Sequence, residues 1–218
     1  MKSTIKAILL LTVFVMTSWQ VQAQSRDKQA TEILNVVTQK TKAYDDIRLE
    51  FEYRMENPDA NINEVTEGTA VVSGDKYRLN IAGQTVISDG ETVWTVIPDA
   101  EEVQVNDAAE GEEVFTPTNL LTNYNEDYKS KLIPRKTEIN GIQVHTLELT
   151  PNEKKTFDKV NLYIRKSEMQ LYAIEIFDQN GSKYTYSITS FEPNTGVDEN
   201  TFKFSATEFQ DFDVIDMR

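Results

Sequence analysis

The stretch that decides the fold is Thr85-Val-Ile-Ser-Asp-Gly-Glu-Thr-Val-Trp-Thr-Val-Ile-Pro-Asp-Ala-Glu-Glu-Val-Gln-Val105, which predicts three strands joined by two tight turns. Asp89-Gly90 favours a two-residue hairpin turn of type I′, because glycine accepts the positive φ that this turn requires. Pro98 and the three residues after it suit a type I turn, since proline has φ fixed at about −65°. We therefore expect an antiparallel meander in the middle of the chain.

Alternation alone leaves open which face of this meander points to the interior. Trp94 and Val96 are one candidate set, and Val93, Thr95 and Ile97 are the other, because both faces look apolar. We predict that Trp94 and Val96 face inward.

Short strands continue on both sides of the meander at intervals of about ten residues. The clearest is 48–56, in which apolar and charged residues alternate strictly. The other predicted strands are 68–72, 76–81, 143–149, 159–165, 171–177 and 183–191, followed by closing segments at 201–204 and 212–215. Nearly all of them can be joined as antiparallel hairpins, which is typical of a twisted sandwich or a barrel. We expect one domain spanning residues 24–218.

Two helices are predicted in this β-rich chain. Residues 27–44 carry apolar side chains at the three-four spacing of an amphipathic helix, so this helix should lie on an apolar surface. Residues 116–124 suit a shorter helix, with Thr116 capping it and Pro117 at its first position.

The first residues predict export. Lys2 and Lys6 flank the apolar run 7–16, which is too short to span a bilayer and precedes Val21-Gln-Ala23. We expect a signal peptide at residues 1–23, cleaved after Ala23, and a soluble periplasmic product. The chain has no cysteine, so disulfides cannot stabilise it and its new N-terminus cannot be lipidated.

The net charge of −14 bears on the choice of partners. Loss of the two leader lysines makes it −16. Such a charge argues against nucleic acid, whose partners need lysine and arginine, and against docking on anionic lipid head groups. Acidity that merely keeps an exported protein soluble is the plainer interpretation.

Catalytic chemistry is poorly represented. His145, the only histidine, lies inside a predicted strand, and there is no phosphate-binding glycine loop or nucleophile elbow. Asp178 to Gly181 resembles the start of a calcium loop but lacks the bidentate glutamate that should follow. Most carboxylates fall on solvent-facing strand positions or in loops. We expect neither an enzyme nor a cofactor or metal site.

The apolar faces of the strands are what remains. An ordinary packed core is the plainer interpretation for any one residue, but a strongly curved sheet only partly covered by helices would leave a cavity suited to a lipid tail. The predicted cavity residues are Leu49, Phe51, Tyr53, Tyr77, Leu79, Ile81, Trp94, Val96, Leu162, Ile164, Ile174 and Ile176. The predicted lid residues are Ile33, Leu34, Val37, Leu120 and Leu121.

Several motifs together resemble the LolA family of periplasmic lipoprotein carriers. They are Gly68, Lys76-Tyr-Arg-Leu79, Ser88-Asp-Gly90 followed by Trp94, Pro98-Asp99, Pro117-Thr-Asn-Leu-Leu121, Asp178-x-x-Gly181 and Thr201-Phe-Lys-Phe204. No single motif is unique, but their order and spacing match the family over residues 27–215.

The resemblance implies an unclosed antiparallel β-barrel, with helices as a lid over an apolar cavity. It implies a monomeric carrier that takes acylated lipoproteins from an inner-membrane ABC-type release complex to an outer-membrane acceptor, with no nucleic acid involved. A carrier or sensor of another lipid or glycolipid is the alternative. Family members often have Arg-Pro where this chain has Ser73-Gly-Asp75, so no lid latch is assigned to those positions.

Overall fold

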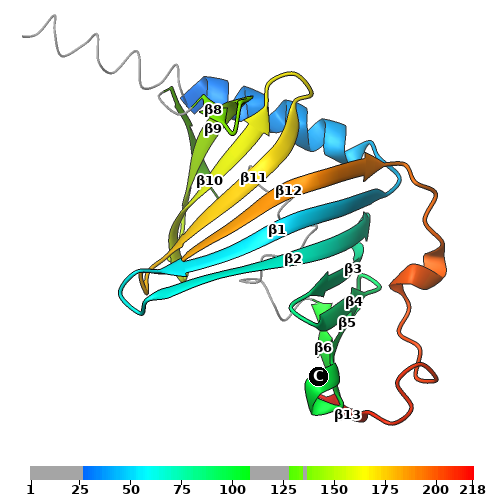
Figure 1. Ribbon diagram of the computed structural model, residues 1–218. Helices are drawn as coiled ribbons and strands as arrows, with labels where there is room; N and C mark the ends of the chain where they lie inside the picture. Colours follow the sequence, from blue (N-terminus) through cyan, green and yellow to red (C-terminus); the bar gives the residue numbers. More distant parts are fainter. Residues whose placement is uncertain (1–26, 109–127, 135–136) are drawn as a thin grey trace, which may run out of the picture.

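One strongly curved β-sheet dominates the computed structural model, which describes residues 27–108, 128–134 and 137–218 (Figure 1). The strands of the described residues are β1 (Ile47–Asn57), β2 (Ile62–Ser73), β3 (Lys76–Ile81), β4 (Gln84–Ser88), β5 (Thr92–Ile97), β6 (Glu102–Asp107), β7 (Tyr128–Ile133), β8 (Glu138–Ile139), β9 (Ile142–Pro151), β10 (Phe157–Arg165), β11 (Gln170–Asp178), β12 (Lys183–Pro193) and β13 (Asp213–Asp216). Two 3-10 turns, η1 (Pro98–Ala100) and η3 (Glu199–Phe202), accompany them.

The strands follow the order β13-β6-β5-β4-β3-β2-β1-β12-β11-β10-β9-β7, with β8 paired to β9. Neighbouring strands are antiparallel except β13, which runs parallel to β6. Because β7 and β13 are not paired with each other, the sheet does not close. The predicted unclosed antiparallel barrel is confirmed.

The helix at residues 27–42 lies against one face of this sheet, which we call the inner face. Ala30, Leu34 and Val37 are almost fully buried there, as the amphipathic spacing predicts. The Oγ1 atom of Thr31 lies 3.3 Å from Oγ of Ser130 on β7, and Lys40 donates to the carbonyl of Glu168 in the β10–β11 turn. Figure 1 shows the helix in blue along the side of the sheet formed by β8–β12.

The pairing register fixes which residues share the inner face, because directly paired residues in antiparallel strands point to the same side. Leu49 pairs with Ala70, Ala70 with Leu79, Leu79 with Val86, and Val86 with Thr95. Thr95 therefore belongs to the inner face, while its neighbours Trp94 and Val96 belong to the opposite, outer face. The inward prediction for Trp94 and Val96 is corrected by this register.

The first turn of the central meander also differs from its prediction. Asp89 donates its backbone N–H to the carbonyl of Thr92, so Gly90 and Glu91 are the central residues. Gly90 has φ of +95°, but Glu91 is not among the residues with positive φ, whereas type I′ requires two such residues. The Asp89 carboxylate accepts from the N–H groups of Glu91 and Thr92 and so fixes the shifted turn.

The last part of the chain covers the outer face of β3–β6. Phe204 stacks on Trp94 with 5.8 Å between the ring centroids, and Phe204 in turn stacks on Phe209. Two ion pairs tie the same segment to β3, Lys76 with Glu199 and Arg78 with Glu208. Figure 1 shows this segment, orange to red, passing from β12 to β13. This segment covers Trp94, and Val96 on the same face is also buried, which explains why apolar residues lie on the outer face.

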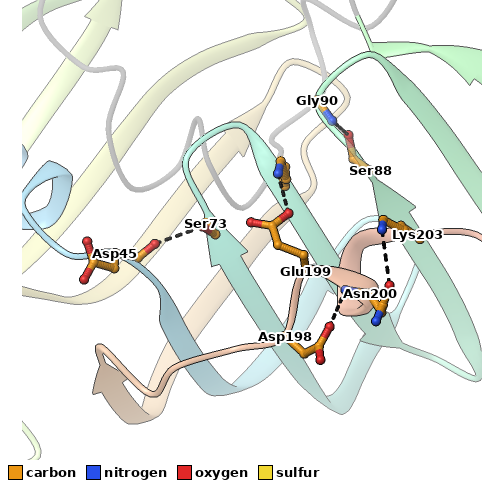
Figure 2. Close-up of polar contacts among 9 residues, drawn as sticks. Asp45, Ser73, Ser88, Gly90, Asp198, Glu199, Asn200 and Lys203 are labelled. Atoms are coloured by element: carbon orange, nitrogen blue, oxygen red, sulfur yellow. Dashed lines mark hydrogen bonds and ion pairs between the residues drawn. The ribbon is translucent and has the colours of Figure 1, made fainter.

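Polar contacts hold the chain where it leaves β12 and forms η3, and they also join the residues before β1 to the end of β2. Figure 2 shows Ser73 donating to the carbonyl of Asp45, and Asp198 capping η3 by accepting from the N–H of Asn200. Beside them, the buried Asp46 carboxylate accepts four hydrogen bonds, from the N–H and hydroxyl of Thr195 and from the N–H groups of Gly196 and Val197. The start of β1 is thereby clamped to the chain that follows β12.

Candidate functional site: the inner face of the sheet

The inner face carries one continuous apolar cluster. Alternation along β1, β3, β10 and β11 places every second side chain on it, and the helix at residues 27–42 adds a further row. Ten of the twelve predicted cavity residues belong to this cluster. They are Leu49, Phe51, Tyr53, Tyr77, Leu79, Ile81, Leu162, Ile164, Ile174 and Ile176.

The predicted lid residues of the helix also join the cluster, with Leu34 and Val37 buried and Ile33 partly buried. Leu120 and Leu121, and the short helix predicted around them, lie outside the described residues. Trp94 and Val96 are on the outer face, as the register shows.

Burial divides the cluster into two regions. On β9–β11, under the helix, Leu147, Leu162 and Ile164 are 0% exposed, so these residues form a closed core. On β12 and β1–β4, Phe191 is partly buried and packs edge-on against Tyr44, and seven further members are partly buried: Tyr53, Leu79, Ile81, Val86, Tyr184, Tyr186 and Ile188. We call these seven the open patch, and among the described residues this region leaves apolar surface within reach of a ligand.

Four residues of the open patch were not in the predicted cavity set. Tyr184, Tyr186 and Ile188 follow the same alternation as β1, so the sequence carried a signal for them. The orientation of Val86 could not be predicted from alternation, because its neighbour Ile87 is equally apolar. The pairing of Val86 with Leu79 assigns it to the inner face.

Aromatic rings make up one end of the open patch. The ring of Tyr53 lies 5.0 Å from that of Tyr186 and 6.4 Å from that of Tyr184, and Tyr186 also contacts Phe51 at 6.0 Å. Tyr53 and Tyr186 are directly paired across β1 and β12. These offset contacts hold the rings in place as a wall rather than as separate mobile side chains.

Glycine at position 68 makes room for one of these rings. Phe51 pairs directly with Gly68, and a Cβ atom added there would lie 2.3 Å from Cζ of Phe51. The ring therefore lies flat over the β2 backbone, which keeps the inner face shallow at this point.

The environment of the tyrosines is poorly hydrated. Burial raises the pKa of Tyr77 and, together with the other phenols nearby, that of Tyr186. Burial also raises the pKa of Tyr53, with further contributions from Tyr184 and Glu64. All three phenols therefore stay neutral near pH 7.

Other features give no sign of chemistry. His145 is half-buried, and burial together with Lys166 lowers its pKa. Among residues 27–108, 128–134 and 137–218, no three histidine or acidic side chains are grouped to bind a metal. In the same ranges, no helix combines the length and apolar character needed to cross a membrane. A cleft of about 680 Å³ on β1–β4 is lined by Glu50, Thr69, Asn80 and Thr85, a paired row of the outer face, and also by Phe51, Gly68 and Ile81.

Comparison with known proteins places this architecture. The family model described as outer membrane lipoprotein carrier protein LolA matches residues 74–205. An outer-membrane lipoprotein carrier protein of Dechloromonas aromatica (strain RCB) is 28% identical over 124 residues, which is 56% of this chain and 57% of that protein.

Solved structures share the fold at low identity. An uncharacterized conserved protein from Thermus thermophilus has a TM-score of 0.58 at 11% identity, over 86% of this chain and 99% of that one. A candidate outer-membrane lipoprotein-sorting domain from Vibrio parahaemolyticus has a TM-score of 0.50 at 14% identity, over 81% and 97% of the two chains.

The chain forms an unclosed half-barrel with an apolar inner face and a helix on one side. The family match covers more than half of the chain, so this protein belongs to the LolA family of outer-membrane lipoprotein carrier proteins.

Proposed function

We propose that this protein is a periplasmic carrier that shields the acyl chains of lipoproteins and delivers them from an inner-membrane ABC-type release complex to an outer-membrane acceptor. The observation that carries the proposal is the open patch, a set of partly exposed apolar residues continuous with the core of a LolA-family half-barrel. The protein performs no catalytic step in this role.

The energetics of transfer explain why such a carrier is needed. Each methylene that leaves water gains about 0.8 kcal/mol, so a long acyl chain gains on the order of 10 kcal/mol in an apolar site. Free diffusion of such a chain through an aqueous compartment is therefore very slow. A partly covered surface shields the chain and still lets an acceptor remove it, which a fully closed core such as the β9–β11 region could not do.

The first test is analysis of the cargo. The protein is purified from its native periplasm and studied by native mass spectrometry with lipid extraction. Acylated lipoprotein bound one to one is the expected result. If a free lipid or glycolipid is bound instead, the cargo is not a lipoprotein, and this result would contradict the proposed delivery role.

A pair of variants tests the site. Leu79→Glu places a charge on the open patch, and Asn80→Glu places the same charge on the other face of the same strand, where Asn80 is exposed. Titration of a fluorescent acyl probe should show at least a tenfold loss of affinity for Leu79→Glu and little change for Asn80→Glu. Equal binding by both folded variants would contradict the assignment of the inner face.

A further inference from the structure

We infer that Tyr53, Tyr184 and Tyr186 recognise the carbonyl groups at the head of the bound acyl chains, so that the site prefers ester-linked or amide-linked chains to plain hydrocarbon. This inference rests on the proposed carrier function and specifies which part of the cargo each region of the open patch contacts.

The first observation is the position of the tyrosines between apolar and charged surface. Along β1, the inner row passes from Leu49 and Phe51 to Tyr53 and then to Met55, which pairs with Glu64 near the start of β2. The ion pair of Glu56 with Lys183 lies at the same end of the sheet. A chain lying over Leu79 and Ile81 would therefore bring its polar end to the tyrosines.

The second observation concerns the three hydroxyl groups. No described residue donates to or accepts from them. The only fully enclosed side-chain nitrogen or oxygen atoms that lack a partner in the described chain are Thr38 Oγ1 and Asn161 Oδ1. The tyrosine hydroxyls are consequently reachable from outside the protein, and each has a hydrogen bond to offer.

The third observation is the charge around them. A phenol hydroxyl can donate a hydrogen bond, while Glu64 lies close enough to Tyr53 to contribute to its raised pKa and the whole chain carries a net charge of −14. A phosphate group would be repelled here, whereas a neutral carbonyl oxygen accepts a hydrogen bond without that cost. The chemistry therefore fits the carbonyls of acylated glycerol or an acylated amine rather than an anionic head group.

The test compares two competitors for a bound fluorescent acyl probe. One is a diacylglycerol and the other is the ether-linked dialkylglycerol of equal chain length, which has no carbonyl groups. Wild type should prefer the ester by about five- to tenfold, as expected for one or two hydrogen bonds. Tyr53→Phe and Tyr186→Phe should reduce this preference and leave the affinity for the ether unchanged, because the rings remain.

Tyr172→Phe is the matched control, since Tyr172 lies in the separate cluster with Val144 and Tyr163 and against Arg165. Equal affinity of wild type for ester and ether, or an ester preference kept by both phenylalanine variants, would overturn the inference while leaving the carrier function standing. Failure of wild type to bind the acyl probe at all would overturn both.

Discussion

At the scale of single residues, Gly68 and Phe51 depend on each other. Gly68→Ala should lower the free energy of unfolding by about 1–3 kcal/mol, because the new methyl group overlaps a ring that is itself packed against Tyr186. Urea denaturation measures the loss, with Thr69→Ala on the exposed outer face as the control. Adding Phe51→Leu should make Gly68→Ala less costly, and strictly additive effects of the two changes would contradict the steric explanation.

At the scale of elements, Asp46 joins β1 to the chain after β12. Burial by itself raises the pKa of Asp46, but the hydrogen bonds from Thr195, Gly196 and Val197 outweigh it, so the pKa lies below the ordinary value of 3.8. A carboxyl whose pKa is lowered by folding stabilises the protein above its unfolded-state pKa and loses this effect as the pH falls through the folded-state pKa.

Asp46→Asn should therefore cost about 2–3 kcal/mol at pH 7, because an amide turns donors toward backbone N–H groups that need acceptors. The difference from wild type should narrow as the pH falls below the ordinary value of 3.8. Denaturant unfolding at several pH values checks this. Asp45→Asn removes the same charge one residue earlier, at an exposed position, and should have little effect. A difference that stays constant down to the lowest pH would contradict the role of the carboxylate.

The strands also show how much of the fold could be predicted from the sequence. Alternation located β1, β3 and β9–β12 closely, because each carries a regular apolar row on its inner face, although Val144, Tyr163 and Tyr172 are also buried on the outer face of β9–β11. It missed β7, an edge strand whose Lys129 and Lys131 are exposed and whose inner row, Tyr128, Ser130 and Leu132, is interrupted by a polar residue. It could not orient β5, because the segment that covers Trp94 lies about 110 residues further along the chain.

At the scale of the whole molecule, the inner face separates stability from binding. Leu162→Ala, under the helix, should lower the free energy of unfolding by about 2–5 kcal/mol and change acyl-probe affinity little. Leu79→Glu should instead lower acyl-probe affinity and change the free energy of unfolding little. It should also abolish the rise in Tm that a bound acyl ligand gives wild type. Thermal unfolding with and without the probe measures both effects. Parallel losses of stability and affinity in the two variants would contradict the division into a core and an open patch.

The strand order has a consequence for how the chain folds. Strands β1–β6 form one local meander and β9–β12 another, and each can assemble from contacts between sequence neighbours. Among the described strands, the two meanders pair with each other only through β1 and β12, and the Asp46–Thr195 contact beside this pair joins residues 149 positions apart. Closing so long a loop is slow, so this seam should set the folding rate. Tyr53 and Tyr186 meet across it, and a newly made chain therefore cannot present its tyrosine wall until that last slow step is complete.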